Sequence, residues 1–149
     1  MTISISRPSA ILLAGEEDGL WEPSMTGVAR NFFVLAMVYA ICGILLGLDM
    51  AISHDHGQMP VHAHTMVLGW LMSGFFAFFY HLFPEIGRSR LAHIHFWLTA
   101  VSGIMLLVSL FFVLGGNEAI EPVTAVSSLV FFSAVVLFVW IALPVVRRA

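Results

Sequence analysis

The sequence predicts an all-α integral membrane protein, built as a four-helix bundle. Of its 149 residues, 60% are hydrophobic and only 10% are charged, and the mean hydropathy is +0.97. A soluble chain of this size has too small an interior to bury so much apolar surface. Its apolar runs are long enough to cross the ~30 Å hydrocarbon core of a bilayer. The connections between these runs are short, so we expect consecutive helices to be antiparallel neighbours.

The first 26 residues differ from the rest because they mix apolar and acidic side chains. Their apolar patch, residues 10–14, is too short to cross a bilayer. Trp21 is suited to the headgroup region. We therefore expect residues 1–26 to form a cytoplasmic or interfacial segment. Residues 27–149 are expected to form one domain of four transmembrane helices.

The four spans are expected at residues 28–52, 60–83, 91–114 and 123–146. In the first span, Gly43 and Gly47 have the GxxxG spacing that allows a neighbouring helix to approach closely. In the second, Pro60 suits a first helical position and Pro84 marks the end. No linker is long enough to separate the spans into two domains.

The distribution of charge predicts an orientation. All six basic residues are arginines, placed before the first span, between the second and third, or after the fourth: Arg7, Arg30, Arg88, Arg90, Arg147 and Arg148. The other two connections carry no basic residue and hold Asp55, Glu118 and Glu121. The positive-inside rule then places both termini in the cytoplasm, and we expect the membrane to be the bacterial inner membrane.

The chemistry-bearing residues are histidines, in two groups: His54, His56, His62 and His64 near the outer side, and His81, His93 and His95 near the inner side. Ionisable residues within or beside a span are functional candidates by default. His64 and His81 are separated by ~25 Å along a helix, so the two groups cannot share one metal ion.

His62 and His64 are two positions apart on the second span. At ~100° per residue their side chains diverge by ~200°, so a regular helix cannot direct both at one ion. The pair suits a helix that serves two sites, one on each side. The alternative is that one of the two faces headgroups or water.

The four outer histidines, including His54 and His56 of the loop, lie within sixteen residues that also contain Asp49, Asp55 and Met59. Imidazole, carboxylate and thioether groups together are able to bind copper or zinc. Because loop residues have no preset geometry, the favoured interpretation is a solvated polar loop. Asp49 or Asp55 is a candidate to orient a ligating histidine through the ring nitrogen that does not bind the metal.

The inner histidines are expected to hydrogen-bond a helix end or to reach the headgroups. His93 and His95 again diverge by ~200°. A second metal site, or a quinone site, at His81, His93 and His95 is the less favoured alternative. The neighbouring aromatic residues are expected to serve packing and lipid contact rather than to line a cofactor slot.

Residues 60 to 104 also carry a family resemblance, through the segments HAHTMVLGW, FFAFFYHLFP, GRSR and LAHIHFWLTAVSG. In this order they resemble the second and third transmembrane helices of subunit I of the haem-copper oxidases, above all in the nitric-oxide-reductase and cbb3-type branches. In that family a histidine near the outer end of the second helix ligates the low-spin haem. The resemblance therefore implies a haem b ligand at His62 or His64, and it leaves open which.

The sequence also departs from the family. Subunit I has twelve spans where this chain has four, and the His-His pair needed for the copper site is absent. The resemblance therefore implies haem binding and electron transfer rather than oxygen reduction. We identify no catalytic residues.

Since the twelve spans of the family form three arcs of four, we hypothesise a homotrimer that imitates the larger protein. A haem between protomers would take His62 from one chain and His64 from the next. Two alternatives remain: a copper- or zinc-binding membrane protein, and a non-catalytic accessory subunit of a respiratory complex. The expected partners are the lipid bilayer, further copies of the chain, and respiratory subunits or quinone. Nothing in the sequence points to nucleic acid.

Overall fold

The computed structural model describes residues 24–147. Of the predicted segment 1–26, only the last three residues fall in this range. Arg7, Trp21 and Arg148 lie outside it. The elements are α1 (Gly27–Ser53), α2 (Met59–His64), the π-helical segment η1 (Thr65–Leu71), α3 (Met72–Leu82), α4 (Pro84–Gly87), α5 (Arg90–Leu114), the 3₁₀ turn η2 (Glu118–Ile120) and α6 (Glu121–Arg147).

The described residues form an all-helical bundle, which confirms the predicted fold class. Four helical stretches are long and apolar enough to cross a membrane: Gly27–Ser53, Met59–Leu82, Arg90–Leu114 and Glu118–Arg147. They contain the four predicted ranges apart from Phe83, where the backbone leaves the helix before Pro84. Because a membrane span must satisfy its backbone groups internally, hydropathy alone locates such helices well.

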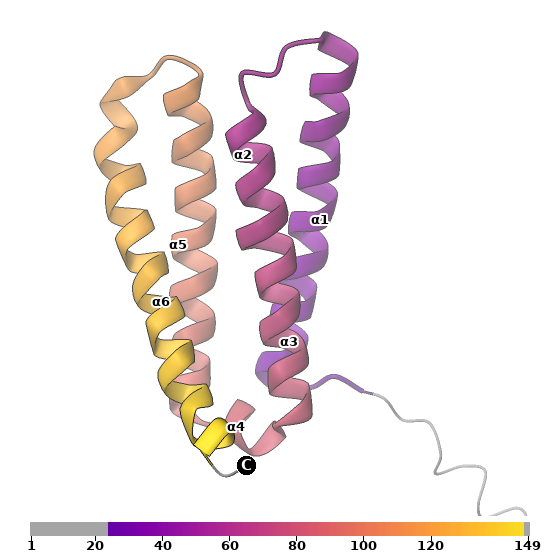
Figure 1. Cartoon of the computed structure of the whole chain (residues 1–149), viewed down its shortest axis with the longest axis vertical. Coiled ribbons are helices and arrows are strands. Elements are labelled where there is room, and N and C mark those ends of the chain that lie inside the picture. Colours follow the sequence, from indigo (N-terminus) through magenta and orange to yellow (C-terminus); the bar gives the residue numbers. More distant parts are fainter. Residues whose placement is uncertain (1–23, 148–149) are drawn as a thin grey trace, which may run out of the picture.

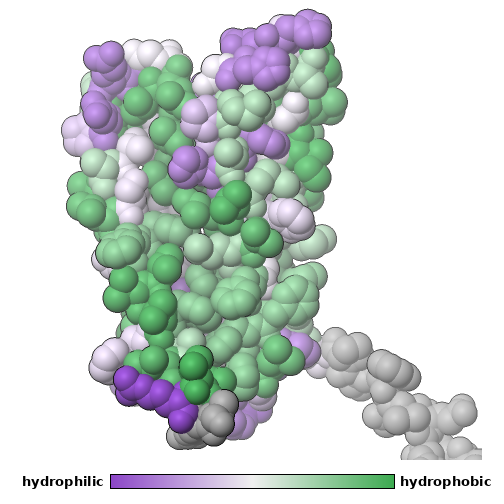
Figure 2. Space-filling view, viewed as in Figure 1, coloured by the Kyte–Doolittle hydropathy of each residue, from purple (hydrophilic) through white to green (hydrophobic). Residues whose placement is uncertain are grey.

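The bundle consists of two antiparallel hairpins placed side by side (Figure 1). One pairs α1 with the continuous stretch α2–η1–α3, and the other pairs α5 with α6. We call the end that carries α4 and the first residue of α5 the basic end; its described arginines are Arg30, Arg88, Arg90 and Arg147. The opposite end, with the loop from His54 to Gln58, is the histidine end. Figure 2 shows hydrophilic residues gathered at both ends and a hydrophobic middle.

The half of the bundle near the basic end is held by a cluster of aromatic rings. Phe32 of α1 is fully buried and contacts Phe76 and Tyr80 of α3, with ring centroids 5.3 and 5.8 Å apart. Phe138 of α6 lies 4.5 Å from Phe76, measured between centroids. His95 of α5 is enclosed by these rings. The cluster therefore joins all four spans.

Glycines bring α1 close to the second span in the other half. A Cβ on Gly43 would collide with the Met66 sulfur, and one on Gly47 would lie 2.9 Å from Cε1 of His62. The GxxxG pair of α1 thus makes room for side chains of the neighbouring helix, as its spacing predicted. On the second span, Gly69 likewise makes room for the ring of Tyr39 of α1.

The π-helical segment η1 was not foreseen. It replaces regular helix from Thr65 to Leu71, directly after His62 and His64. An inserted π turn changes the rotation of the helix before it relative to the helix after it, and such segments often occur at functional sites. The two histidines still diverge within α2, but both are rotated relative to α3 compared with a regular helix running from Pro60 to Leu82.

Candidate functional site

His62 projects from α2 against α1. Its Nδ1 lies 2.8 Å from the carbonyl oxygen of Gly43, and its ring is partly buried over Gly47. A carbonyl oxygen only accepts hydrogen bonds, so Nδ1 must carry the proton. The neutral imidazole then keeps its lone pair on Nε2, which makes no hydrogen bond within the described residues. The ring of His62 is therefore held through Nδ1, and its Nε2 has no partner among the described residues.

His64 has the same local arrangement on a different face. Its Nδ1 lies 2.7 Å from the carbonyl oxygen of Pro60, four residues earlier, and the residue is exposed. The lone pair of the neutral ring is again on Nε2. Histidines that ligate metals in proteins commonly donate their second nitrogen to a carbonyl or carboxylate in this way.

The loop between α1 and α2 forms hydrogen bonds within itself. His54 ends α1 in the left-handed conformation, with φ of 58°. An Asp55 carboxylate oxygen accepts from the backbone N–H of Gly57 at 2.9 Å, and Nδ1 of His56 donates to the carbonyl of His54 at 3.3 Å. Asp49 is exposed and makes no side-chain hydrogen bond within residues 24–147. The carbonyls of Gly43 and Pro60, rather than either aspartate, hold the imidazoles of the α2 histidines.

Within residues 24–147 no three side chains of histidine, cysteine, aspartate or glutamate come together to hold a metal ion. The set His54, His56, His62 and His64 is thus spread over a loop and two faces of α2. A bare copper or zinc site built from them stays a prediction from the sequence.

At the basic end, the three inner histidines have different surroundings. His95 is fully buried, and its Nδ1 lies 2.9 Å from the Tyr80 hydroxyl. Its Nε2 has no partner among the described residues and faces the aromatic cluster. Because rings from α1, α3 and α6 pack against it, His95 belongs to the core, and the expectation that it bonds a helix end or reaches the headgroups is wrong. The sequence offered no signal for this pair, since Tyr80 and His95 lie on different spans.

His93 and His81 are both exposed. Nδ1 of His93 donates to the carbonyl of Ser89 at 2.9 Å, at the start of α5, which agrees with the expected contact to a helix end. The structure therefore brings His81, His93 and His95 to one end of the bundle without joining them in one cluster.

Several buried hydroxyls also lack partners within the described part of the chain. They are those of Tyr39, Ser73, Thr99 and Ser127. The first three line one narrow space in the middle of the bundle, together with Gly103, where a Cβ would lie 3.0 Å from the Tyr39 oxygen. Hydroxyls scattered through apolar spans gave no sequence signal for this grouping.

Comparison with known proteins gives a distant likeness over part of the chain. The chain is 29% identical to a nitric oxide reductase subunit from Stutzerimonas stutzeri, in an alignment that covers 58% of this chain and 21% of that protein. The chain thus spans about a fifth of its relative's length. No protein family model matches the chain, and no solved structure matches it. This likeness supports, for part of the chain, the resemblance drawn from residues 60 to 104.

Proposed function

We propose that this chain is a membrane redox protein that binds b-type haem through histidines of α2. The observation that carries the proposal is the pair of Nδ1 hydrogen bonds, from His62 to the Gly43 carbonyl and from His64 to the Pro60 carbonyl. Both bonds leave the lone pair of the neutral ring on Nε2. A lone pair on a ring nitrogen is what a histidine ligand donates to haem iron. The partial likeness to a nitric oxide reductase, which is a redox enzyme by its name, supports the same class.

The two ligands of one iron would come from two chains. His62 faces α1 and His64 is exposed on another face of α2, so one chain offers a single imidazole on each side. A closed ring of three chains would place His62 of one protomer opposite His64 of the next. That assembly would explain why His64 is exposed, because the second histidine of its haem would belong to the neighbouring chain.

The residues of the chain supply binding and orientation. Haem with two imidazole ligands supplies one-electron transfer when bound. The Gly43 carbonyl fixes the His62 ring and increases the basicity of Nε2. Gly47 gives that ring the space it occupies, since a Cβ there would lie 2.9 Å from Cε1.

The test is an optical spectrum, with iron, copper and zinc analysis, of the chain purified in mild detergent. We expect a redox-dependent Soret band, about one haem per chain, and the mass of a trimer. His62→Ala and His64→Ala should each abolish the band. His93→Ala is the matched control, because His93 also donates Nδ1 to a carbonyl four residues earlier but lies at the other end.

Other outcomes would identify the alternatives. A colourless protein with stoichiometric copper or zinc, lost in His54→Ala and His56→Ala, would replace the haem proposal with metal binding. A monomer without metal that co-purifies with larger respiratory subunits would indicate an accessory role.

A further inference from the structure

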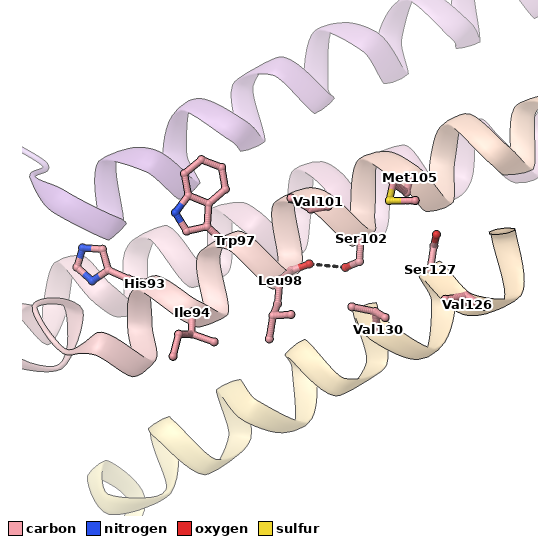
Figure 3. Close-up of a pocket in the computed structure, with 10 residues that line it drawn as sticks. All are labelled: His93, Ile94, Trp97, Leu98, Val101, Ser102, Met105, Val126, Ser127 and Val130. Atoms are coloured by element: carbon pink, nitrogen blue, oxygen red, sulfur yellow. Dashed lines mark hydrogen bonds between the residues drawn. The ribbon is translucent and has the colours of Figure 1, made fainter.

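A long apolar groove lies between α5 and α6, away from the α2 histidines. Its volume is about 590 Å³, within the range of small-molecule sites. It is lined by His93, Ile94, Trp97, Leu98, Val101, Ser102, Met105, Val126, Ser127 and Val130. Figure 3 shows Ile94 and Leu98 projecting from α5 toward α6, with His93 at one end and Ser127 far from it. Its length and apolar walls suit a hydrocarbon chain.

The mouth of this groove at the basic end carries positive charge without a negative partner among the described residues. Arg90 begins α5 and lies three residues before His93, so the two share a face of the helix. Helix α5 contains no acidic residue, and the one acid of α6, Glu121, begins that helix at the histidine end. The exposed Glu85 pairs with Arg88 at 2.9 Å. The N-terminus of α5 adds the positive end of a helix dipole.

His93 gives the mouth a hydrogen-bond acceptor. Because its Nδ1 donates to the Ser89 carbonyl at 2.9 Å, the lone pair of the neutral ring lies on Nε2. Trp97, one turn further along α5, is 63% exposed, and tryptophan is enriched at headgroup depth. A ligand that satisfies this end would carry a negative charge for Arg90 and a hydroxyl for His93.

We propose that the groove binds one anionic phospholipid with a hydroxylated headgroup, of the phosphatidylglycerol type. The phosphate lies at Arg90 and the start of α5, and a headgroup hydroxyl donates to Nε2 of His93. One acyl chain follows the groove past Leu98 and Val130. Basic pockets between transmembrane helices are known to select anionic lipids in this way. The site is separate from the proposed haem ligands and does not depend on them.

Native mass spectrometry of the full chain, after exchange into detergent with equal phosphatidylglycerol and phosphatidylcholine, tests the proposal. We expect a retained phosphatidylglycerol adduct and little phosphatidylcholine. Arg90→Gln should lower the retained fraction about tenfold, the factor expected when a charge-assisted hydrogen bond is lost. His93→Leu should lower it less, since a neutral hydrogen bond is weaker. Arg88→Gln is the matched control, because Arg88 is engaged with Glu85, and it should leave retention unchanged.

A second variant tests the groove itself without touching its charges. Val130→Trp places a large ring in the path of the acyl chain and should remove the adduct while Arg90 and His93 remain. Equal retention of both lipids would overturn the proposal. So would unchanged phosphatidylglycerol retention in Arg90→Gln and Val130→Trp, or an adduct with a quinone that phosphatidylglycerol does not displace. The spectrum of each variant shows separately whether haem binding is intact.

Discussion

The two halves of the bundle use histidine in opposite ways. At the basic end, His95 is fully buried among aromatic rings and hydrogen-bonded to Tyr80 of another span. At the histidine end, His62 and His64 bond only to backbone carbonyls among residues 24–147, each through Nδ1. The most buried histidine is therefore the one least able to accept a cofactor. Enclosure by other side chains marks a structural role for His95, whereas His62 and His64 are held by backbone carbonyls outside the aromatic cluster and are the candidate ligands.

The difference follows from what packs around each ring. Aromatic side chains from α1, α3 and α6 fill the space around His95 and leave no room for a porphyrin. Around His62 the neighbours in α1 are Gly43 and Gly47, which contribute backbone and no side chain. Large side chains thus fill one half, and in the other half small residues let the neighbouring helix approach closely. Substitutions in each half separate these two roles.

The largest effect is expected from Phe76→Ala in the aromatic cluster. Removing this buried ring leaves a cavity at the meeting point of four spans and should cost about 3–5 kcal/mol of stability. The measurement is the free energy of unfolding in detergent micelles. Phe78→Ala, on the same helix but exposed, should change it by less than about 0.5 kcal/mol. Equal effects of the two changes would contradict the assigned core.

A smaller loss is expected from Tyr80→Phe. The change keeps the ring but leaves Nδ1 of the buried His95 without its partner, at a cost of about 1–3 kcal/mol. Unfolding measured as for Phe76→Ala gives the value. In the double variant Tyr80→Phe, His95→Leu, part of the loss should be recovered, because no polar group is then left unpaired. A strict sum of the two single effects would argue against the hydrogen bond.

Gly47→Ala tests the half of the bundle near the histidine end. Its Cβ would lie 2.9 Å from Cε1 of His62, so the ring must shift and its bond to the Gly43 carbonyl weakens, at a cost of about 1 kcal/mol. The expected readout is a displaced or lost Soret band in a protein that remains folded. Gly74→Ala is the control, since a Cβ there meets nothing within 4 Å. An unchanged spectrum in Gly47→Ala would weaken the assignment of His62.

The smallest effect on stability is expected from His64→Ala. The ring is exposed and bonded only within α2, so the free energy of unfolding should change by less than about 0.5 kcal/mol. The haem band should nevertheless be lost, together with the trimer. A large loss of stability with an unchanged spectrum would reverse the roles assigned to His64 and His95.

The candidate residues of the site could be predicted from the sequence, but the bonds that orient their side chains could not. The placement of His62 and His64 on different faces followed from their spacing on a helix, and the close approach at Gly43 and Gly47 followed from the GxxxG pair. The bonds that orient both rings depend on backbone carbonyls, which every residue has, so no side-chain pattern could indicate them. The same holds for η1, because a π turn inserted into an apolar run leaves its composition unchanged.

The sequence by itself determined the four spans, their order and the gathering of arginines at one end, because a bilayer imposes apolar length on each helix separately. Only the tertiary structure decided that Tyr80 meets His95, that His62 lies over Gly47, and that α5 and α6 enclose a groove. Those relations join residues far apart in the chain. Packing between helices, rather than the hydropathy of any one of them, decides which histidine is enclosed by side chains and which are held only by backbone carbonyls.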